Sequence, residues 1–108
     1  MGIDPGLLKK IKTSIRISHT ALDEDVDDNI IACLADLHVV GVLAEKLDPS
    51  QELDPLILSA VKMYCKANYT DDPAKGAEYL KRYEALKSCL RMAEGYGYIE
   101  DPDEEARR

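Results

Sequence analysis

The stretch from Leu53 to Thr70 constrains this chain most, because it is apolar around most of a helical circumference. Its polar side chains fall on one narrow strip, at Ser59, Lys62 and Lys66. A helix of this kind is usually surrounded by other elements, whereas an amphipathic helix lies on a surface. The stretch therefore predicts the central helix of a helical domain.

Both ends of this helix are marked in the sequence. Asp54 stands where an N-cap residue is expected, and Pro55 stands at the first helical position, where a missing N–H costs nothing. Asn68 and Thr70 come just before the helix-breaking run Asp-Asp-Pro at residues 71–73. We therefore expect the helix to end close to Thr70.

The first and last helices follow from the same kind of pattern. Leucine and isoleucine recur at helical spacing over residues 4–17, after Asp4 and Pro5 in cap and first-turn positions. Residues 73–94 predict the last helix. Its expected apolar stripe consists of Tyr79, Leu80, Tyr83, Leu86, Leu90 and Ala93.

A second helix is predicted through Val40. Thr20 and Asp23 have the spacing of a capping box at its start, and the acidic residues that follow suit the positive end of a helix dipole. Gly41 is well placed as the residue after the helix end, although the helix could also run on to Glu45. Residues 42–52 would then form a loop longer than a compact bundle needs, which suggests that it carries a contact.

The fold class that results is all-α, a small bundle of about four helices around the central helix 53–70. We expect a single domain over residues 1–99, followed by a flexible acidic tail at residues 100–108, whose charge and proline disfavour packing. The chain lacks Trp and Phe, so aliphatic residues must build the core, with six tyrosines as the only aromatic side chains.

Charge and hydropathy exclude several functions. A net charge of −7 argues against a surface that grips nucleic acid, which requires clustered lysine and arginine. No run approaches the length of a membrane span, and no signal-peptide pattern is present, so we expect an intracellular protein with no membrane contact.

Neither a metal site nor a catalytic site is predicted. Cys33, Cys65 and Cys89 are unpaired and far apart, as expected of small core residues in a reducing compartment. The alternating acids that begin at Asp23 resemble the start of a calcium loop, but the glycine and glutamate that such a loop needs are missing. His38 has no partner at ligand spacing, and no phosphate loop or nucleophile motif occurs. We expect no enzyme activity and no cofactor.

Tyrosine and lysine are the better candidates for function, as contact residues. Tyrosine is enriched at protein interfaces because it combines a large apolar area with a polar tip. Core packing explains Tyr64 and Tyr83 equally well. The candidate contacts with other subunits or partners are Lys62, Lys66, Tyr69, Tyr79, Tyr96 and Tyr98.

Three stretches together resemble one family. They are LKKIKTSIRISHTALDEDVDDNII at residues 8–31, DPLILSAVKMYCKANY at 54–69 and YLKRYEALKSCL at 79–90. Their order and spacing resemble the small head–tail connector proteins (adaptor or head-completion proteins) of tailed bacteriophages and prophages. The resemblance covers roughly residues 5–95 and rests on core positions and helix ends. The Gly-Tyr-Gly-Tyr run at residues 95–98 and the acidic extension match no part of the family pattern.

The resemblance implies a structural role. Family members assemble into a homo-oligomeric ring, here of about twelve subunits, beneath the portal protein of the filled capsid. Such a ring extends the DNA channel and docks the next head-completion or tail protein. DNA would pass without specific binding, which suits an acidic chain. The implied location is the head–tail junction of the virion, and the host cytoplasm during assembly.

A second interpretation belongs to another class, a small helical regulatory or DNA-binding adaptor module. A helix-turn-helix would need a recognition helix with outward polar residues, and only Lys62 and Lys66 come close. Salt-dependent DNA binding would favour this interpretation.

Overall fold

A computed structural model describes residues 3–92 of the chain, and over these residues the protein is helical with no β-strand. The elements are α1 (Pro5–Ser14), α2 (Asp23–Val39), a short 3₁₀ turn η1 (Ala44–Lys46), α3 (Pro55–Tyr69) and α4 (Pro73–Met92). The predicted all-α fold with four helices is confirmed. The proposed boundary at residue 99, the tail at 100–108, and both Tyr96 and Tyr98 lie outside the described residues.

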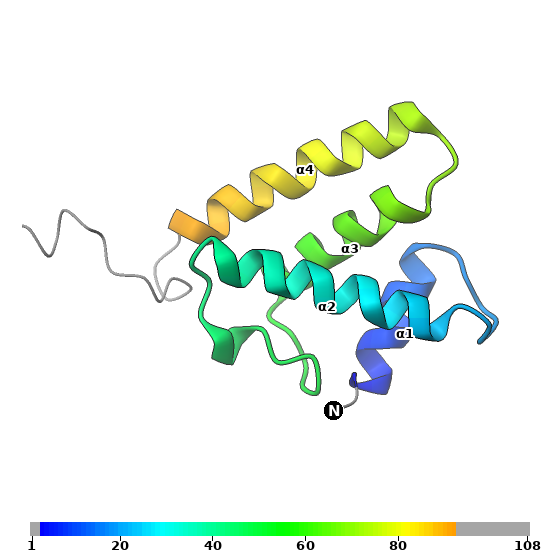
Figure 1. Ribbon diagram of the computed structural model, residues 1–108, viewed down its shortest axis with the longest axis horizontal. Coiled ribbons are helices and arrows are strands. Elements are labelled where there is room, and N and C mark those ends of the chain that lie inside the picture. Colours follow the sequence, from blue (N-terminus) through cyan, green and yellow to red (C-terminus); the bar gives the residue numbers. More distant parts are fainter. Residues whose placement is uncertain (1–2, 93–108) are drawn as a thin grey trace, which may run out of the picture.

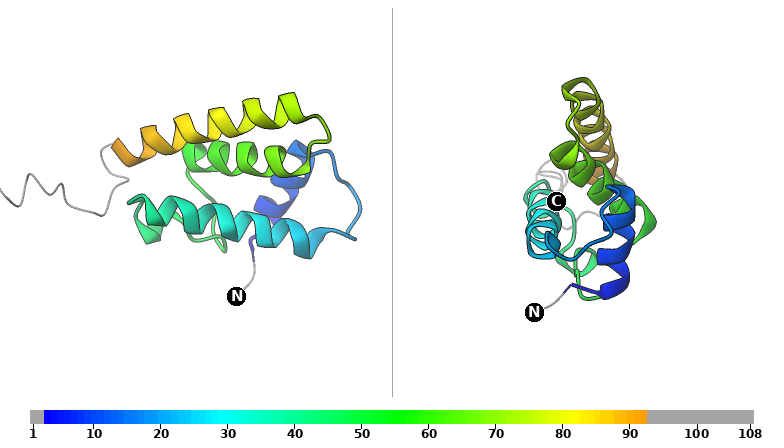
Figure 2. Two further views of the ribbon diagram at one scale, coloured as in Figure 1. Left: turned by 45° about the horizontal axis from the view of Figure 1, so that its top comes forward. Right: turned by 90° about the vertical axis from the view of Figure 1, so that its right-hand side faces the viewer.

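The helix α3 lies in the middle of the arrangement (Figure 1). It pairs most extensively with α4, which returns antiparallel to it, and it also packs against α1 and α2. Figure 2 shows α4, α3 and α2 stacked in that order, with α1 crossing beside the lower two helices. The end of α4 and the end of α2 therefore lie at one end of the molecule, and the α3–α4 turn lies at the other.

Three of the four helices begin with the same dipeptide, Asp-Pro. In α1, α3 and α4 the aspartate carboxylate accepts a hydrogen bond from a backbone N–H of the first turn, at 2.9 to 3.0 Å. The proline that follows occupies a position whose N–H would have no partner within the helix. The predicted starts of α1 and α3 at Asp4 and Asp54 are thus confirmed.

The predicted capping box at the start of α2 is wrong. The helix begins at Asp23 with Leu22 as its N-cap residue, and no side chain caps it. Thr20 acts through its backbone instead, because its carbonyl accepts the Asp23 N–H at 3.1 Å in the preceding turn. The Asp23 carboxylate forms an ion pair with Lys12 of α1 at 2.6 Å. Because of this tertiary contact, the carboxylate does not cap the start of its own helix.

The end of α2 matches the prediction made from Gly41. The helix stops at Val39, so the alternative end at Glu45 is wrong. Gly41 has a φ of 111°, and its N–H and that of Val42 bond back to the carbonyls of the last turn. This double bond pattern is a Schellman motif, in which glycine costs least at the left-handed position. Val42 is fully buried, as its predicted position on the last turn requires.

The segment from Val42 to Leu53 contributes three side chains to the core. Val42, Leu47 and Leu53 are all buried, and the carbonyl of Pro49 accepts the backbone N–H of Asp4 at 2.7 Å. The contact expected of this long loop is therefore in part internal, since the segment fastens the start of α1.

The core is aliphatic with one buried tyrosine. Tyr83 is 2% exposed, and its ring meets that of half-buried Tyr64 edge to face with centroids 5.2 Å apart. The fully enclosed residues of α3 are Ile57, Ala60, Val61 and Cys65. The stripe predicted on α4 is correct for Tyr83 and Leu90, but Leu80 is 47% exposed, because α4 packs mainly on α3 and leaves its other side to solvent. Ala93 of the same stripe lies outside the described residues.

Candidate interaction site

The candidate contact residues that the structure describes lie on α3 and α4. Lys62, Lys66, Tyr69 and Tyr79 are all half-buried. Lys62, one turn before Lys66 on α3, has no ion-pair partner within residues 3–92 and does not line the hollow described next. Lys66, Tyr69 and Tyr79 instead line one hollow at the end of the molecule that carries the α3–α4 turn.

Tyr69 ties α3 to the beginning of α2. Its hydroxyl donates a hydrogen bond to the Asp25 carboxylate and accepts one from the Asn29 side-chain amide at 3.2 Å. The amide of Asn68 donates to Asn29 at 2.8 Å, which completes a polar network between the two helices. Burial, followed by the neighbouring Asp25, raises the pKa of Tyr69. The hydroxyl is thus engaged within the subunit, and the ring remains on the wall of the hollow.

Lys66 of α3 and Tyr79 of α4 face each other. The Lys66 ammonium lies 5.6 Å from the centre of the Tyr79 ring, within the range of a cation–π contact. The contact holds the lysine against the hollow, and the same ammonium has no carboxylate partner among the described residues.

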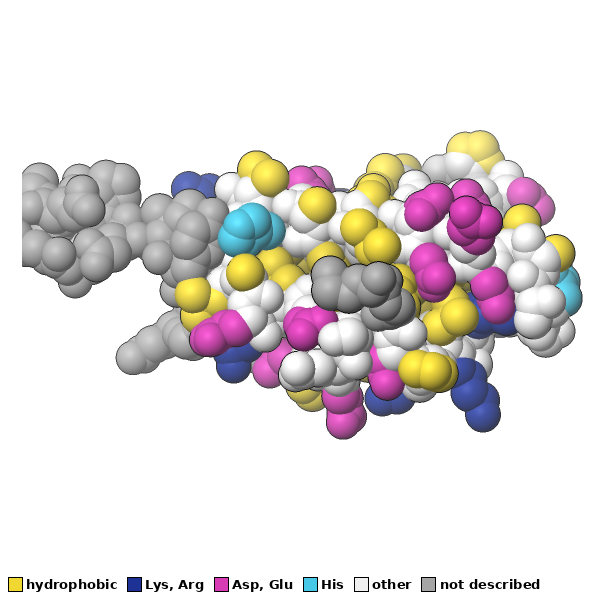
Figure 3. Space-filling model, turned by 60° about the horizontal axis from the view of Figure 1, so that its bottom comes forward, with side chains coloured by type: hydrophobic (Ala, Val, Ile, Leu, Met, Phe, Trp, Pro, Cys, Tyr) yellow, Lys and Arg dark blue, Asp and Glu magenta, His cyan; other side chains and the backbone are white. Residues whose placement is uncertain are grey.

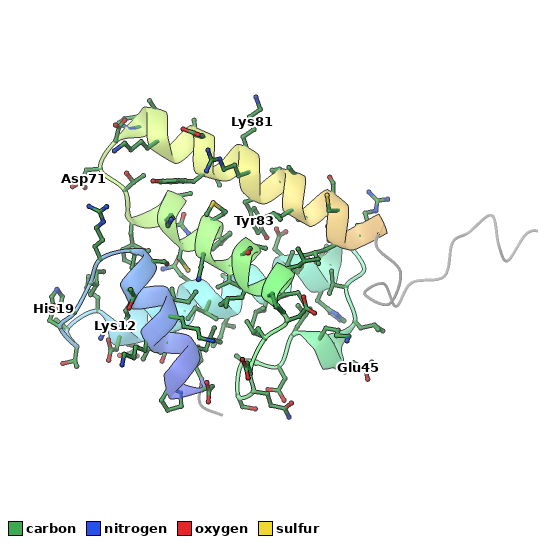
Figure 4. The ribbon with its side chains drawn as sticks, turned by 180° about the vertical axis from the view of Figure 1, so that it is seen from behind. Lys12, His19, Glu45, Asp71, Lys81 and Tyr83 are labelled. Carbon is green, nitrogen blue, oxygen red and sulfur yellow. The ribbon has the colours of Figure 1, made fainter. Side chains whose placement is uncertain are left out.

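The hollow itself has a volume of about 250 Å³ and lies between the end of α1 and the α3–α4 turn. In Figure 4 the end of α1 lies beneath that turn, which Asp71 marks. Three cationic side chains line it, Arg16, Lys66 and Lys75, and no acidic side chain does. The remaining lining residues are Ser14, Ile15, Tyr69, Thr70 and Tyr79. This arrangement suits an anionic group.

Arg16 reaches this hollow from an unusual backbone conformation. Its φ is 61°, in the left-handed region that favours glycine. The N–H groups of Arg16 and Ile17 bond back to Thr13 and Lys12 at 3.2 and 2.9 Å, so α1 ends in the same motif as α2, with arginine where α2 has Gly41. Sequence patterns do not reveal this residue, because no glycine marks the helix end.

A second polar cluster, around Asp36 of α2, is structural. The Tyr83 hydroxyl donates to Asp36 at 2.6 Å, and the Lys87 ammonium lies 3.1 Å from the same carboxylate. Burial alone would raise the pKa of Asp36, but the hydrogen bonds from Tyr83 and Lys87 outweigh it and lower that pKa. In Figure 4 Tyr83 lies on the inner side of α4, whereas Lys81 projects from the outer side. The cluster fastens α4 to α2.

An apolar groove of about 340 Å³ runs beside α2 on a different face. Its lining residues are Ile3, Ile31, Leu34, Ala35, His38, Ala44, Leu47 and Pro49. Ile31 is 49% exposed, and Val39 on the same helix is 75% exposed. Figure 3 shows hydrophobic side chains along this face and acidic side chains gathered at one end of it.

The residues considered for metal or acid–base chemistry have ordinary structural surroundings. The ring of His38 lies 3.2 Å from the Val42 carbonyl, next to the end of its own helix. The acids that begin at Asp23 are in the first turns of α2, in a helix and not in a loop. Within residues 3–92, no group of three or more His, Cys, Asp or Glu side chains is placed to hold a metal ion.

The three cysteines divide by burial. Cys33 and Cys65 are fully enclosed, and loss of hydration raises the pKa of each thiol to about 12. Cys89 is exposed on α4, so its predicted place in the core is wrong. Cys89 follows Ser88 and lies on the side of α4 that faces solvent.

Comparison with known proteins identifies a family. The family model described as phage connector protein matches residues 7–97, which includes α2, α3 and α4 and all but the first two residues of α1. No curated protein and no solved structure gives a match. In the part of the chain that is described, no helix is long and apolar enough to cross a membrane. Because the match spans most of the chain, this protein belongs to the phage connector proteins, a structural family of the virion.

Proposed function

We propose that this protein is a head–tail connector. Its subunits assemble as a homo-oligomeric ring under the portal protein, extend the DNA channel and dock the next head-completion or tail protein. The observation that carries the proposal is the family match over residues 7–97, which covers the bundle as one unit.

The surfaces of the subunit support assembly into a ring. A closed ring needs head-to-tail contacts, in which two different faces of each subunit meet. The basic hollow lies between the end of α1 and the α3–α4 turn, whereas the exposed apolar residues Ile31 and Val39 lie on α2. The subunit thus exposes two surfaces of unlike chemistry in different places.

Net charge supports a channel through which DNA moves. The chain carries −7, and its second helix begins with Asp23, Glu24 and Asp25. A wall of like charge repels the phosphate backbone and leaves DNA free to slide, whereas a basic wall would hold it.

The DNA-binding alternative has less support. A recognition helix must enter a groove with its polar face. The helix considered for this role, α3 with Lys62 and Lys66, packs against α1, α2 and α4 and has four fully enclosed residues.

Assembly with the portal tests the proposal. The purified chain is mixed with the portal protein encoded with it, and the products are measured by native mass spectrometry and negative-stain microscopy. We expect a ring of about twelve subunits on the portal. A control with the chain alone separates self-assembly from assembly on the portal. A monomer in both samples would refute the proposal, and salt-dependent binding to duplex DNA by such a monomer would favour the regulatory module.

A further inference from the structure

We infer that the basic hollow binds the acidic run at residues 100–105 of a second copy of this chain. The run follows α4, and the hollow lies at the opposite end of the α3–α4 pair. Such a contact would join subunits head to tail. The inference rests on the proposed ring and names the surface and the segment that would link its neighbours.

The hollow is a concentration of uncompensated positive charge in an acidic chain. Arg16, Lys66 and Lys75 line it, and none of them has an ion-pair partner within residues 3–92. The nearby Asp72 carboxylate accepts the backbone N–H groups that begin α4. By contrast, Lys12 and Lys87 are each paired with an acid of α2. The three cations are therefore available to an incoming anion.

The conformation of Arg16 adds to this argument. A residue with a side chain at a φ of 61° costs stability that glycine in the same place would not. Strain of this kind collects at binding sites, where the surrounding structure holds it. Here it places a guanidinium, the side chain best suited to pairing with carboxylates, on the rim of the hollow.

Residues 100–105 provide the complementary charge. The sequence is Glu-Asp-Pro-Asp-Glu-Glu, so five of the six residues are carboxylates. The proline favours an extended backbone before it, and an extended segment presents its carboxylates one after another to the cations that line the hollow. Duplex DNA is broader, and it would also meet the acidic start of α2, which lies at the same end of the molecule.

The length of chain between α4 and the acidic run favours binding to a neighbouring subunit over binding to the same subunit. Lys75 and Met92 are 17 residues apart on α4, which corresponds to roughly 26 Å along the helix axis. The eight residues from 93 to 100 span about 27 Å only when fully extended. Self-binding through Glu100 would thus require the chain to double back at full stretch, at a high cost in conformational entropy, and only the later carboxylates of the run could reach the hollow of their own subunit with slack. A second copy placed head to tail brings its α4 end toward the hollow without that cost.

Zero-length cross-linking of mixed isotopes tests the inference on the full chain. Equal amounts of ¹⁴N and ¹⁵N protein are assembled with the portal, treated with a carbodiimide that joins lysine to carboxylate, and digested. We expect tail peptides joined to Lys66 or Lys75, in part as hybrids of ¹⁴N and ¹⁵N. Internal controls are the pair Lys12–Asp23, 2.6 Å apart, which should join within one chain, and Lys81 on the outer side of α4, which should not join the tail.

Charge reversal supplies a matched pair of variants. Arg16→Glu with Lys75→Glu reverses two exposed cations of the hollow, and Lys9→Glu with Lys81→Glu makes the same change in net charge at exposed positions that do not line it. We expect the hybrid cross-link to Lys66 to fall at least about tenfold in the first variant and to stay within about twofold in the second, because local pairing and not net charge holds the tail.

Several results would overturn the inference. Tail cross-links that never form hybrids would mean that the tail binds its own subunit. Absence of tail cross-links, while the pair Lys12–Asp23 joins, would mean that the hollow does not receive the tail. Binding of a short DNA duplex that is lost in the hollow variant alone would assign the hollow to phosphate. If rings still form on the portal in any of these cases, the connector function stands without this contact.

Discussion

Replacing Tyr83 by phenylalanine tests the fastening between α4 and α2. The ring is 2% exposed and meets Tyr64 edge to face, and the hydroxyl donates to Asp36 at 2.6 Å. Phenylalanine keeps the ring, its packing and its contact with the Lys87 ammonium, 5.2 Å from the ring centre. The substitution therefore removes the hydrogen bond to the charged acceptor Asp36, together with the contact of the hydroxyl with the buried Cys33 thiol.

The magnitude follows from the surroundings of Asp36. A hydrogen bond to a charged group contributes about 1.5–3 kcal/mol. The carboxylate keeps its ion pair with Lys87, and its side chain is 39% exposed, so water can replace the lost donor. We therefore expect a loss near the lower end, about 1.5 kcal/mol, which corresponds to a fall in Tm of roughly 6–12 °C for a domain of this size.

Chemical and thermal unfolding, followed by circular dichroism, measure this loss. The matched control is Tyr79→Phe, one turn earlier on the same helix, whose hydroxyl has no hydrogen bond among the described residues. The control should change the free energy of unfolding by less than about 0.5 kcal/mol. Equal effects of the two substitutions would refute the assignment of Tyr83 as a fastening residue.

The pH dependence of the same variant has a defined sign. Hydrogen bonds lower the pKa of Asp36 in the folded protein, so its contribution to stability is present above the unfolded value, near 3.8. That contribution is lost as the pH falls through the folded pKa. The difference between the wild-type protein and Tyr83→Phe should therefore be full at pH 7 and shrink below about pH 4.

Three further outcomes follow from the backbone, the thiols and the acidic start of α2. Gly41 and Arg16 both have a left-handed backbone conformation, which favours glycine. Gly41→Ala should therefore lower the free energy of unfolding by about 1 kcal/mol, and Arg16→Gly should raise it by up to about 1 kcal/mol. Changes of the same sign for the two substitutions in denaturant titrations would contradict this. A thiol reagent should modify Cys89 alone in the native protein and all three cysteines in denaturant, as mass spectrometry can show; fast native labelling of the other two would mean that they are not enclosed. Burial and the neighbouring acids raise the pKa of Asp27, so its ionisation destabilises the fold as the pH rises through that pKa. Asp27→Asn should therefore stabilise the protein at pH 7 and have little effect at pH 3.

Structural features that depend on a few adjacent residues were predictable from the sequence. The Asp-Pro dipeptides gave correct starts for α1 and α3, and Gly41 gave the end of α2, because caps and Schellman motifs depend on a few neighbouring residues. The error at Thr20 has a tertiary cause. Its predicted capping partner, Asp23, pairs with Lys12 on another helix, and sequence spacing does not show that contact.

The site was less predictable than the fold, for the same reason. Lys66, Tyr69 and Tyr79 were expected to make contacts, but the hydroxyl of Tyr69 is satisfied by Asp25, 44 residues away. Arg16 completes the hollow from the end of α1 and carried no sequence signal of that role. A binding surface assembled from three separated segments is determined by how the helices pack, which local patterns do not encode.

The way in which α4 packs determines the order in which the helices unfold. This outermost helix buries Tyr83 and Leu90 and packs mainly on α3, whereas α3 also contacts α1 and α2. Backbone amides of an outer helix with few enclosed side chains open by local unfolding, at a lower free energy than those of a central one. The bundle is therefore best understood as a stable inner layer with a looser outer helix, whose backbone amides exchange with solvent before those of α3.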